Sequence, residues 1–197
     1  MLGYTIKDWI ERDGINFLRD IGLRPGQVVL DFGCNVGHYT IPAAKVIGDD
    51  GTVYALDKDK GSLEELKQTA EEEGLKNIVP LHGDLGPGIN LKTDSVDVVL
   101  LYDVLHYLET GERKMLYREV HRVLKSDGLL SVYPKHNKFD DPLWNLSHVG
   151  LNGIIEEIEA ENFSLAAKLN RQLIHDNYYN TGYIVNFRKI FKYPVII

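Results

Sequence analysis

Short apolar runs rich in β-branched residues alternate with segments of helical periodicity between residues 28 and 133. The runs occupy positions 28–30, 52–56, 78–81, 96–101 and 129–133. Strands of a parallel sheet are buried on both faces, so they consist of nearly continuous apolar residues. A chain in which such strands alternate with helices is predicted to adopt an α/β fold built on a mostly parallel sheet.

The pattern changes after residue 133. Residues 134–147 are polar and aromatic, which is typical of a loop, and the apolar residues within 151–158 predict one more helix. Apolar and polar residues then alternate at 163–169 and again at 183–187. Because we expect no helix between these last two strands, they predict an antiparallel pair that closes the sheet.

Two expected helices begin with a capping-box pattern, in which a hydroxyl residue is followed three positions later by an acidic one. Thr5 and Asp8 form such a pair before the first helix. Ser62 and Glu65 form another, before a helix that Gly74 is expected to end.

Composition limits the functions that the chain can have. Its 197 residues are consistent with one domain, and its net charge of −7 argues against duplex nucleic acid or an anionic membrane surface as the main partner. The one cysteine, Cys34, excludes an internal disulfide and a zinc site of several cysteines. The seven histidines have no paired spacing, which predicts no metal site.

Features of membrane-spanning or exported chains are also missing from the sequence. No segment approaches the roughly 20 consecutive apolar residues that a membrane-spanning helix needs. Residues 1–13 carry charged side chains where a signal peptide would have an apolar stretch. We therefore expect a cytoplasmic protein.

The first strand runs directly into a glycine-containing turn, Asp31-Phe32-Gly33-Cys34-Asn35-Val36-Gly37. A strand that breaks into such a turn before a helix presents backbone N–H groups at the carboxyl edge of the sheet, where ligands of α/β proteins bind. The spacing departs from the dinucleotide fingerprint G-x-G-x-x-G, since Asn35 and His38 occupy its second and third glycine positions. A nucleotide-dependent reductase is therefore disfavoured.

Acidic residues follow three consecutive strands. Asp31 precedes the glycine turn, Asp57 closes the second strand, and Asp84 comes just after the third. A carboxylate at the end of the second strand can accept two hydrogen bonds from a ribose diol, and one after the third can accept from an exocyclic amine. Together these acids fit a nucleoside with a cationic side chain better than a phosphate.

These elements, in this order, resemble the motifs of class I S-adenosylmethionine-dependent methyltransferases. Residues 28–37 resemble the first motif, V-L-D-x-G-C-G-x-G, and residues 118–128 resemble the R-E-x-x-R-V-L-K-P-G-G segment. Asp57 and Gly83-Asp84 are similar to the second and third acidic elements of the family. The resemblance implies a Rossmann-like, doubly wound sheet of seven strands, and S-adenosylmethionine as the cofactor.

The resemblance also implies an organisation for the whole chain. Residues 1–197 would form a single methyltransferase domain. Within it, 1–26 would be an N-terminal helical cap and 27–133 the cofactor-binding core, and 134–197 would supply the substrate-side loop, helix and closing strand pair. We expect a monomer or a homodimer.

Cofactor contacts are carried over position by position. The resemblance places Asp31, Gly33 and Gly37 beside the methionine part, Asp57 at the ribose and Asp84 at the adenine. The full set of expected cofactor-binding residues is Asp31, Gly33, Cys34, Asn35, Gly37, Tyr39, Asp57, Lys58, Asp84, Leu85, Leu101 and Tyr102. Asn35 replaces the middle glycine of the family motif, so the backbone there needs either a left-handed asparagine or an altered loop.

Candidate catalytic residues lie after the fourth and fifth strands. Histidine is a suitable general base at neutral pH, so His106 and His136 are the first candidates, and Asp103 could orient an amine or a hydroxyl. The segment Leu101-Tyr102-Asp103-Val104 lacks the N-P-P-Y type sequence of enzymes that methylate planar nitrogens. We therefore expect a small-molecule acceptor. The alternatives are an inactive S-adenosylmethionine-binding protein and, less favoured, a protein or RNA methyltransferase.

Overall fold

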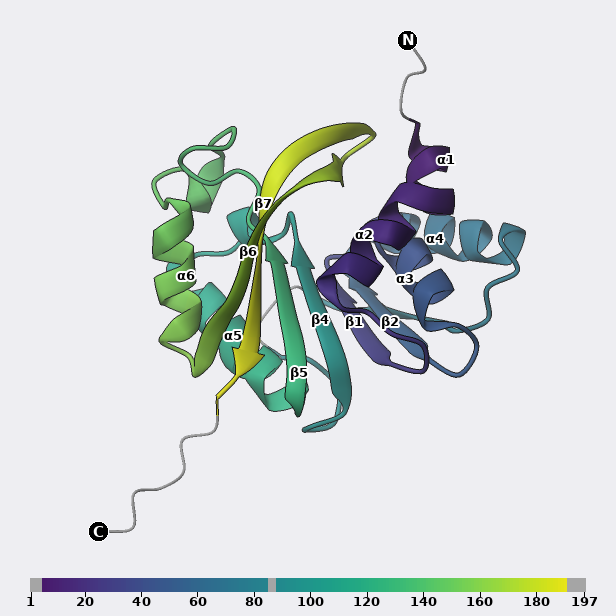
Figure 1. Ribbon diagram of the computed structural model, residues 1–197, viewed down its shortest axis with the longest axis horizontal. Helices are drawn as coiled ribbons and strands as arrows, with labels where there is room; N and C mark the ends of the chain where they lie inside the picture. Colours follow the sequence, from purple (N-terminus) through teal and green to yellow (C-terminus); the bar gives the residue numbers. More distant parts are fainter. Residues whose placement is uncertain (1–4, 85–87, 191–197) are drawn as a thin grey trace.

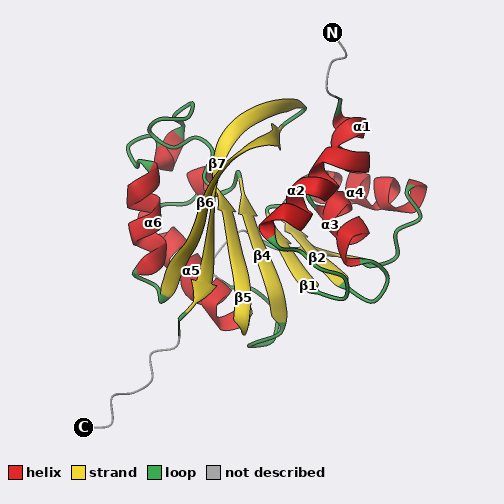
Figure 2. Cartoon of the chain, viewed as in Figure 1, coloured by secondary structure: helices red, strands yellow, loops and turns green. Residues whose placement is uncertain are grey.

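In the computed structural model, which describes residues 5–84 and 88–190, seven strands form one sheet in the order β3-β2-β1-β4-β5-β7-β6 (Figures 1 and 2). The strands are β1 Val28–Phe32, β2 Thr52–Asp57, β3 Ile78–His82, β4 Val96–Tyr102, β5 Leu124–Tyr133, β6 Phe163–His175 and β7 Tyr178–Lys189. The α-helices are α1 Ile6–Asp8, α2 Gly14–Ile21, α3 Thr40–Ile47, α4 Lys60–Glu72, α5 Thr110–Val123 and α6 Leu151–Glu159. A π-helix at Trp9–Asp13 and 3-10 helices at Leu105–Tyr107 and Trp144–Leu146 complete the helical segments of the described residues.

The sheet is parallel from β3 to β5 and antiparallel beyond it. β1 pairs with β2 and β4, and the outer neighbours β3 and β5 continue the parallel order. β7 lies antiparallel between β5 and β6. This arrangement confirms the Rossmann-like, mostly parallel fold with an antiparallel C-terminal pair.

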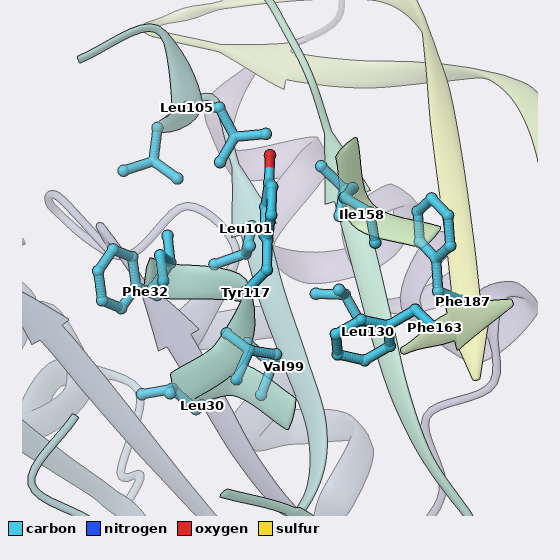
Figure 3. Packing of buried hydrophobic residues seen from close by; sticks show 14 of the residues in the cluster. Leu30, Phe32, Val99, Leu101, Leu105, Tyr117, Leu130, Ile158, Phe163 and Phe187 are labelled. Carbon is cyan, nitrogen blue, oxygen red and sulfur yellow. The ribbon is translucent and has the colours of Figure 1, made fainter. Parts of the chain in front are cut away.

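Helices cover both faces of the sheet because the apolar strands alternate their side chains between the faces. On β4, Val99 and Leu101 pack toward α5 and α6, as Figure 3 shows together with Tyr117 and Ile158. Val98, Leu100 and Tyr102 lie in the cluster that includes residues of α2 and α3. The buried β4 is thus the centre of two cores.

The structure contains one of the two capping boxes that the sequence predicts. Thr5 and Asp8 form the expected reciprocal box at α1, which confirms that prediction. The box expected at Ser62 and Glu65 is wrong: α4 begins earlier, and Asp59 caps it by accepting the Ser62 N–H at 2.7 Å. Aspartate is as good an N-cap as serine, so the local pattern alone does not decide between them.

The closing strands are longer than their alternating patterns predicted. β6 and β7 bend over the carboxyl edge of the sheet toward the N-terminal helices (Figure 1). Tyr179 donates to Asp13 at 2.9 Å, and the Tyr39 hydroxyl donates to the Ile174 carbonyl at 2.8 Å. These contacts hold the end of β6 above the glycine turn. None of the helices within the described ranges has the length and apolar character needed to span a membrane.

Candidate active site

A cavity of about 250 Å³ lies at the carboxyl ends of β1, β2 and β4, below the end of β6. It is lined by seven of the residues expected to bind cofactor, namely Gly33, Cys34, Asn35, Tyr39, Asp57, Lys58 and Tyr102. Four carboxylates, of Asp57, Asp59, Asp103 and Asp176, also line it. The excess of acidic groups suits a ligand that carries positive charge.

The glycine turn forms one wall of the cavity through backbone conformations that most residues avoid. Gly33 has a φ of 78° and Gly37 a φ of 92°. Asn35 has a φ of 48°, which confirms that asparagine replaces the family glycine in the left-handed region. A Cβ added at Gly33 would lie 2.8 Å from Cγ2 of Val104, which also lines the cavity. A side chain at Gly33 would therefore clash with Val104, so the close packing of the turn against Val104 requires glycine.

Asp57 lies at the end of β2, and its carboxylate accepts two hydrogen bonds from the backbone. Oδ2 accepts the backbone N–H of Asn35 at 2.8 Å, and Oδ1 accepts that of Asp59 at 2.9 Å. A carboxylate offers about four acceptor positions, so two remain for hydroxyl donors in the cavity. Its place beside the glycine turn fits a ribose diol.

Four other expected contacts, Asp31, Gly37, Leu101 and Asp84, do not line this cavity. Asp31 is 2% exposed and accepts the Thr40 hydroxyl at 2.5 Å. Leu101 is fully buried in the core between the sheet and helices α5 and α6. Asp84 lines a neighbouring cavity of about 490 Å³ with His82. His82 bonds the Lys58 carbonyl at 3.2 Å, which links this second cavity to the first. Leu85 lies outside the described residues.

Asp31 is a buried acid with an unusual titration. Burial, and then the nearby Asp57 charge, raise the pKa of Asp31 to about 7, although the hydrogen bond from Thr40 opposes the rise. The folded protein therefore holds a proton on Asp31 that the unfolded chain releases near its ordinary pKa of 3.8. Folding stability consequently falls as the pH rises through this interval.

Asparagine at position 31 is expected to flatten this pH dependence. The contribution of Asp31 to the free energy of unfolding is fully present below about pH 4 and is lost as the pH rises through about 7. The free energy of unfolding changes there by at most about 1.4 kcal/mol per pH unit. The amide does not titrate and still accepts from Thr40. Urea unfolding of both proteins between about pH 4.5 and 8 measures the slopes. Equal slopes would contradict the assignment of the proton to Asp31.

Three histidines surround Asp103 at the end of the cavity away from Asp57. His175 Nδ1 donates to Asp103 Oδ2 at 2.5 Å. Asp103 Oδ1 lies 3.5 Å from His106 Nδ1 and 3.7 Å from His136 Nε2. The three imidazoles are buried. Burial raises the pKa of the Asp103 carboxyl, and the nearby His175 opposes that rise.

The candidate bases differ in their access to the cavity. Asp103 and His175 line it, whereas His106 and His136 lie behind them, 3% and 4% exposed. Burial, followed by the nearby His136 and His175, lowers the pKa of His106 to about 3. A ring this weakly basic makes a poor general base at neutral pH.

Sequence reasoning missed His175. It stands 72 positions from Asp103 in the chain, at the end of a strand whose alternating pattern stops being regular several residues earlier. The only signal was its presence in the segment 134–197 assigned to the substrate side. Pairing of β6 with β7, and of β7 with β5, brings it to the cavity.

Comparison with known proteins identifies this arrangement. A family model described as a methyltransferase domain matches residues 29–128, from β1 into β5. The chain belongs to this family. Methyltransferase domains of the class I fold use S-adenosylmethionine, and the glycine turn and Asp57 of this methyltransferase domain fit that cofactor.

Relatives of the methyltransferase domain match it over part of their length. Aklanonic acid methyltransferase of Streptomyces sp. (strain C5) is 37% identical over 76 residues, 34% of each chain. Demethylmenaquinone methyltransferase of Geobacillus stearothermophilus is 28% identical over 112 residues, 57% of this chain and 47% of its own. The chain thus spans between 34% and 47% of these curated relatives.

A solved structure matches the methyltransferase domain along nearly its whole length. The crystal structure of a SAM-dependent methyltransferase from Aquifex aeolicus has a TM-score of 0.75 and 21% sequence identity, with 93% of both chains covered. At this identity the likeness shows a shared fold, which includes the closing strand pair.

Proposed function

We propose that this methyltransferase domain transfers a methyl group from S-adenosylmethionine to a small-molecule acceptor. One observation carries the proposal: a single cavity joins the glycine turn and Asp57 at one end to the Asp103–His175 pair at the other. The first end has the geometry for a nucleoside, and the second has polar groups that can hold an acceptor. A transferase needs both ends in one cavity.

The chain contributes mainly binding and alignment to this chemistry. When bound, S-adenosylmethionine supplies a methyl group on a positively charged sulfur, which makes that carbon strongly electrophilic. Asp57 would hold the ribose through hydrogen bonds, and the turn at Gly33 would allow close approach of the cofactor. Tyr102 and Val104 line the cavity between its two ends, where they would limit the access of water.

The acceptor end would fix the orientation of the second substrate. Asp103 is held by His175 and lies in the left-handed region at a φ of 54°, a conformation that costs energy outside glycine. Its carboxylate and the imidazoles around it would orient an acceptor hydroxyl or amine in line with the methyl group. Alignment of this kind supplies a large part of the rate acceleration in two-substrate reactions.

Several observations favour a small molecule as the acceptor. The two curated relatives are named for the methylation of aklanonic acid and of demethylmenaquinone, both small molecules. The net charge of −7 disfavours nucleic acid. In the described part of this segment, residues 134–190, a loop with a short 3-10 helix at Trp144–Leu146, one α-helix and two strands are added to the core, which makes a small cap over the cavity. We infer that this segment forms the acceptor side.

Alanine at position 57 is expected to weaken S-adenosylmethionine binding by about 1–3 kcal/mol, a rise in Kd of roughly 5- to 150-fold. The physical reason is the loss of two hydrogen-bond acceptors for the ribose. Isothermal titration calorimetry with S-adenosylmethionine and S-adenosylhomocysteine measures both affinities. Asp50→Ala, in the exposed turn before the same strand, is the matched control and should bind as the wild type does.

Two outcomes separate the possible functions. Absence of binding to either ligand by the folded wild type would refute the proposal. Binding without methyl transfer, tested with a labelled methyl group across small phenols, quinols, amines and carboxylic acids, would support an inactive binding protein instead. An unchanged affinity of Asp57→Ala would remove Asp57 from the ribose site.

A further inference from the structure

The cluster around Asp103 combines side chains from three distant parts of the fold. Asp103 follows β4, His136 follows β5, and His175 ends β6. One coordinating atom from each lies within 4.8 Å of the others. Such convergence of two imidazoles and a carboxylate is the arrangement in which proteins hold divalent transition metals.

The hydrogen bonding of His136 leaves its second ring nitrogen facing a carboxylate. Its Nδ1 lies 2.8 Å from the Asp141 carbonyl, which can only accept, so Nδ1 carries the proton. The other ring nitrogen, Nε2, faces Asp103 Oδ1 at 3.7 Å. A proton or a metal ion between these two atoms would interact favourably with both.

The same carboxylate oxygen faces a second unpaired nitrogen. His106 Nδ1 lies 3.5 Å from Asp103 Oδ1, and within the described part of the chain both atoms are buried without a hydrogen-bond partner. The His106 side chain is 4% exposed, so water does not readily replace the missing partner. Burial of unsatisfied polar atoms is unfavourable, and a cation bound between these two atoms would satisfy both.

We propose that Asp103, His136 and His175 bind one divalent transition-metal ion, with His106 beside it as a further nitrogen ligand. Zn²⁺ binds nitrogen and oxygen atoms at about 2.0–2.2 Å in tetrahedral geometry, so neighbouring ligand atoms lie about 3.3–3.6 Å apart. The distances of 3.5 and 3.7 Å around Asp103 Oδ1 are close to this range. Imidazole-rich sites favour Zn²⁺, Fe²⁺ or Ni²⁺ over Mg²⁺ and Ca²⁺.

One feature matches known metal sites, and another would change when the ion binds. The hydrogen bond from His136 Nδ1 to a backbone carbonyl is the usual support of a histidine ligand, because it fixes the ring and directs Nε2 at the ion. The proton between His175 Nδ1 and Asp103 Oδ2 is one that the ion would displace on binding.

The ion would act at the acceptor end of the cavity. Asp103 and His175 line the cavity, so if His106 stays outside the coordination shell, the fourth position of the ion would be open to the bound acceptor. This role rests on the proposed function, and it defines the acceptor further as a molecule with an oxygen that binds metal when deprotonated, such as a phenol or an enol. The metal site itself is independent of the reaction.

Calorimetric titration of chelator-treated protein with Zn²⁺ tests the inference, and Mg²⁺ serves as the comparison ion. We expect one Zn²⁺ per chain and much weaker binding of Mg²⁺. His136→Ala should lower the Zn²⁺ affinity at least about 100-fold. His148→Ala, which removes an exposed histidine from the same loop, should leave it unchanged. Asp103→Asn is the second variant, and Co²⁺ absorption in the visible range reports the donor set of each protein.

The two proposals fail in different ways. Equal Zn²⁺ affinity of wild type and His136→Ala would overturn the metal site, as would no Zn²⁺ binding by a wild type that binds S-adenosylmethionine. Retention of Zn²⁺ by a folded protein that does not bind S-adenosylmethionine would instead refute the proposed function and support the metal site. Thermal melting of each variant identifies loss of affinity caused by unfolding.

Discussion

Valine in place of Gly33 is expected to abolish S-adenosylmethionine binding, with a loss of at least about 100-fold in affinity, or about 2.7 kcal/mol. Gly33 has a φ of 78°, and its added Cβ would lie 2.8 Å from Cγ2 of Val104. Both residues line the cavity, so a branched side chain occupies space there and displaces the turn. Isothermal titration calorimetry measures the binding.

A matched variant separates the cavity from backbone strain. Gly26 has nearly the same φ, 77°, but among the described residues no atom lies within 4 Å of its added Cβ. It lies before β1, at the end of the strand opposite Gly33. Gly26→Val should therefore lose about 1–3 kcal/mol of stability and keep its affinity. If Gly33→Val folds and binds as Gly26→Val does, the turn is not the cofactor wall.

Alanine at Arg113 is expected to lower the free energy of unfolding by about 3–5 kcal/mol. Arg113 is fully buried on α5 and forms a bidentate pair with Glu157 of α6, at 2.9 and 2.7 Å. Its Nη1 also donates to the Leu108 carbonyl at 2.8 Å. Removal of the cation leaves a partly buried carboxylate and a buried carbonyl without their donor. Urea unfolding followed by circular dichroism measures the change.

The same helix provides a control with the same chemistry. Arg118 forms a bidentate pair with Glu161 at 2.7 and 3.0 Å, but its side chain is 65% exposed. Arg118→Ala should cost less than Arg113→Ala, because water solvates the exposed Arg118 guanidinium, and only the carboxylate of Glu161, whose side chain is 11% exposed, loses its partner. Similar losses in the two variants would show that burial does not decide the contribution of these pairs. Arg113→Ala in a Glu157→Ala background measures their coupling directly.

The fold was predictable because its determinants are local. Nearly continuous apolar runs such as 96–101, which Asp97 alone interrupts, mark strands that are buried on both faces, and strict alternation at 163–169 marks the antiparallel edge. Exact boundaries were less predictable. The cap at Asp59 and the extension of β6 to His175 depend on contacts that the local sequence does not contain.

The two ends of the cavity differed in how far the sequence could predict them. The cofactor end is built from the turn at 31–37 and from Asp57, whose positions follow from the strands that carry them. Leu101 and Tyr102 show where this approach stops. Both are apolar neighbours at the end of a doubly buried strand, so the sequence does not indicate which one faces the cavity. The structure directs Tyr102 there and Leu101 into the core.

The sequence by itself determined the succession of strands and helices along the chain, the glycine turn, and the acid at the end of the second strand. Each of these depends on residues close together in the chain. Only the tertiary structure brought Asp103, His136 and His175 to one point. They belong to separate elements, and His175 reaches Asp103 because β7 pairs with both β5 and β6. Contacts at such separations are fixed by strand pairing, which spacing between histidines in the sequence does not encode.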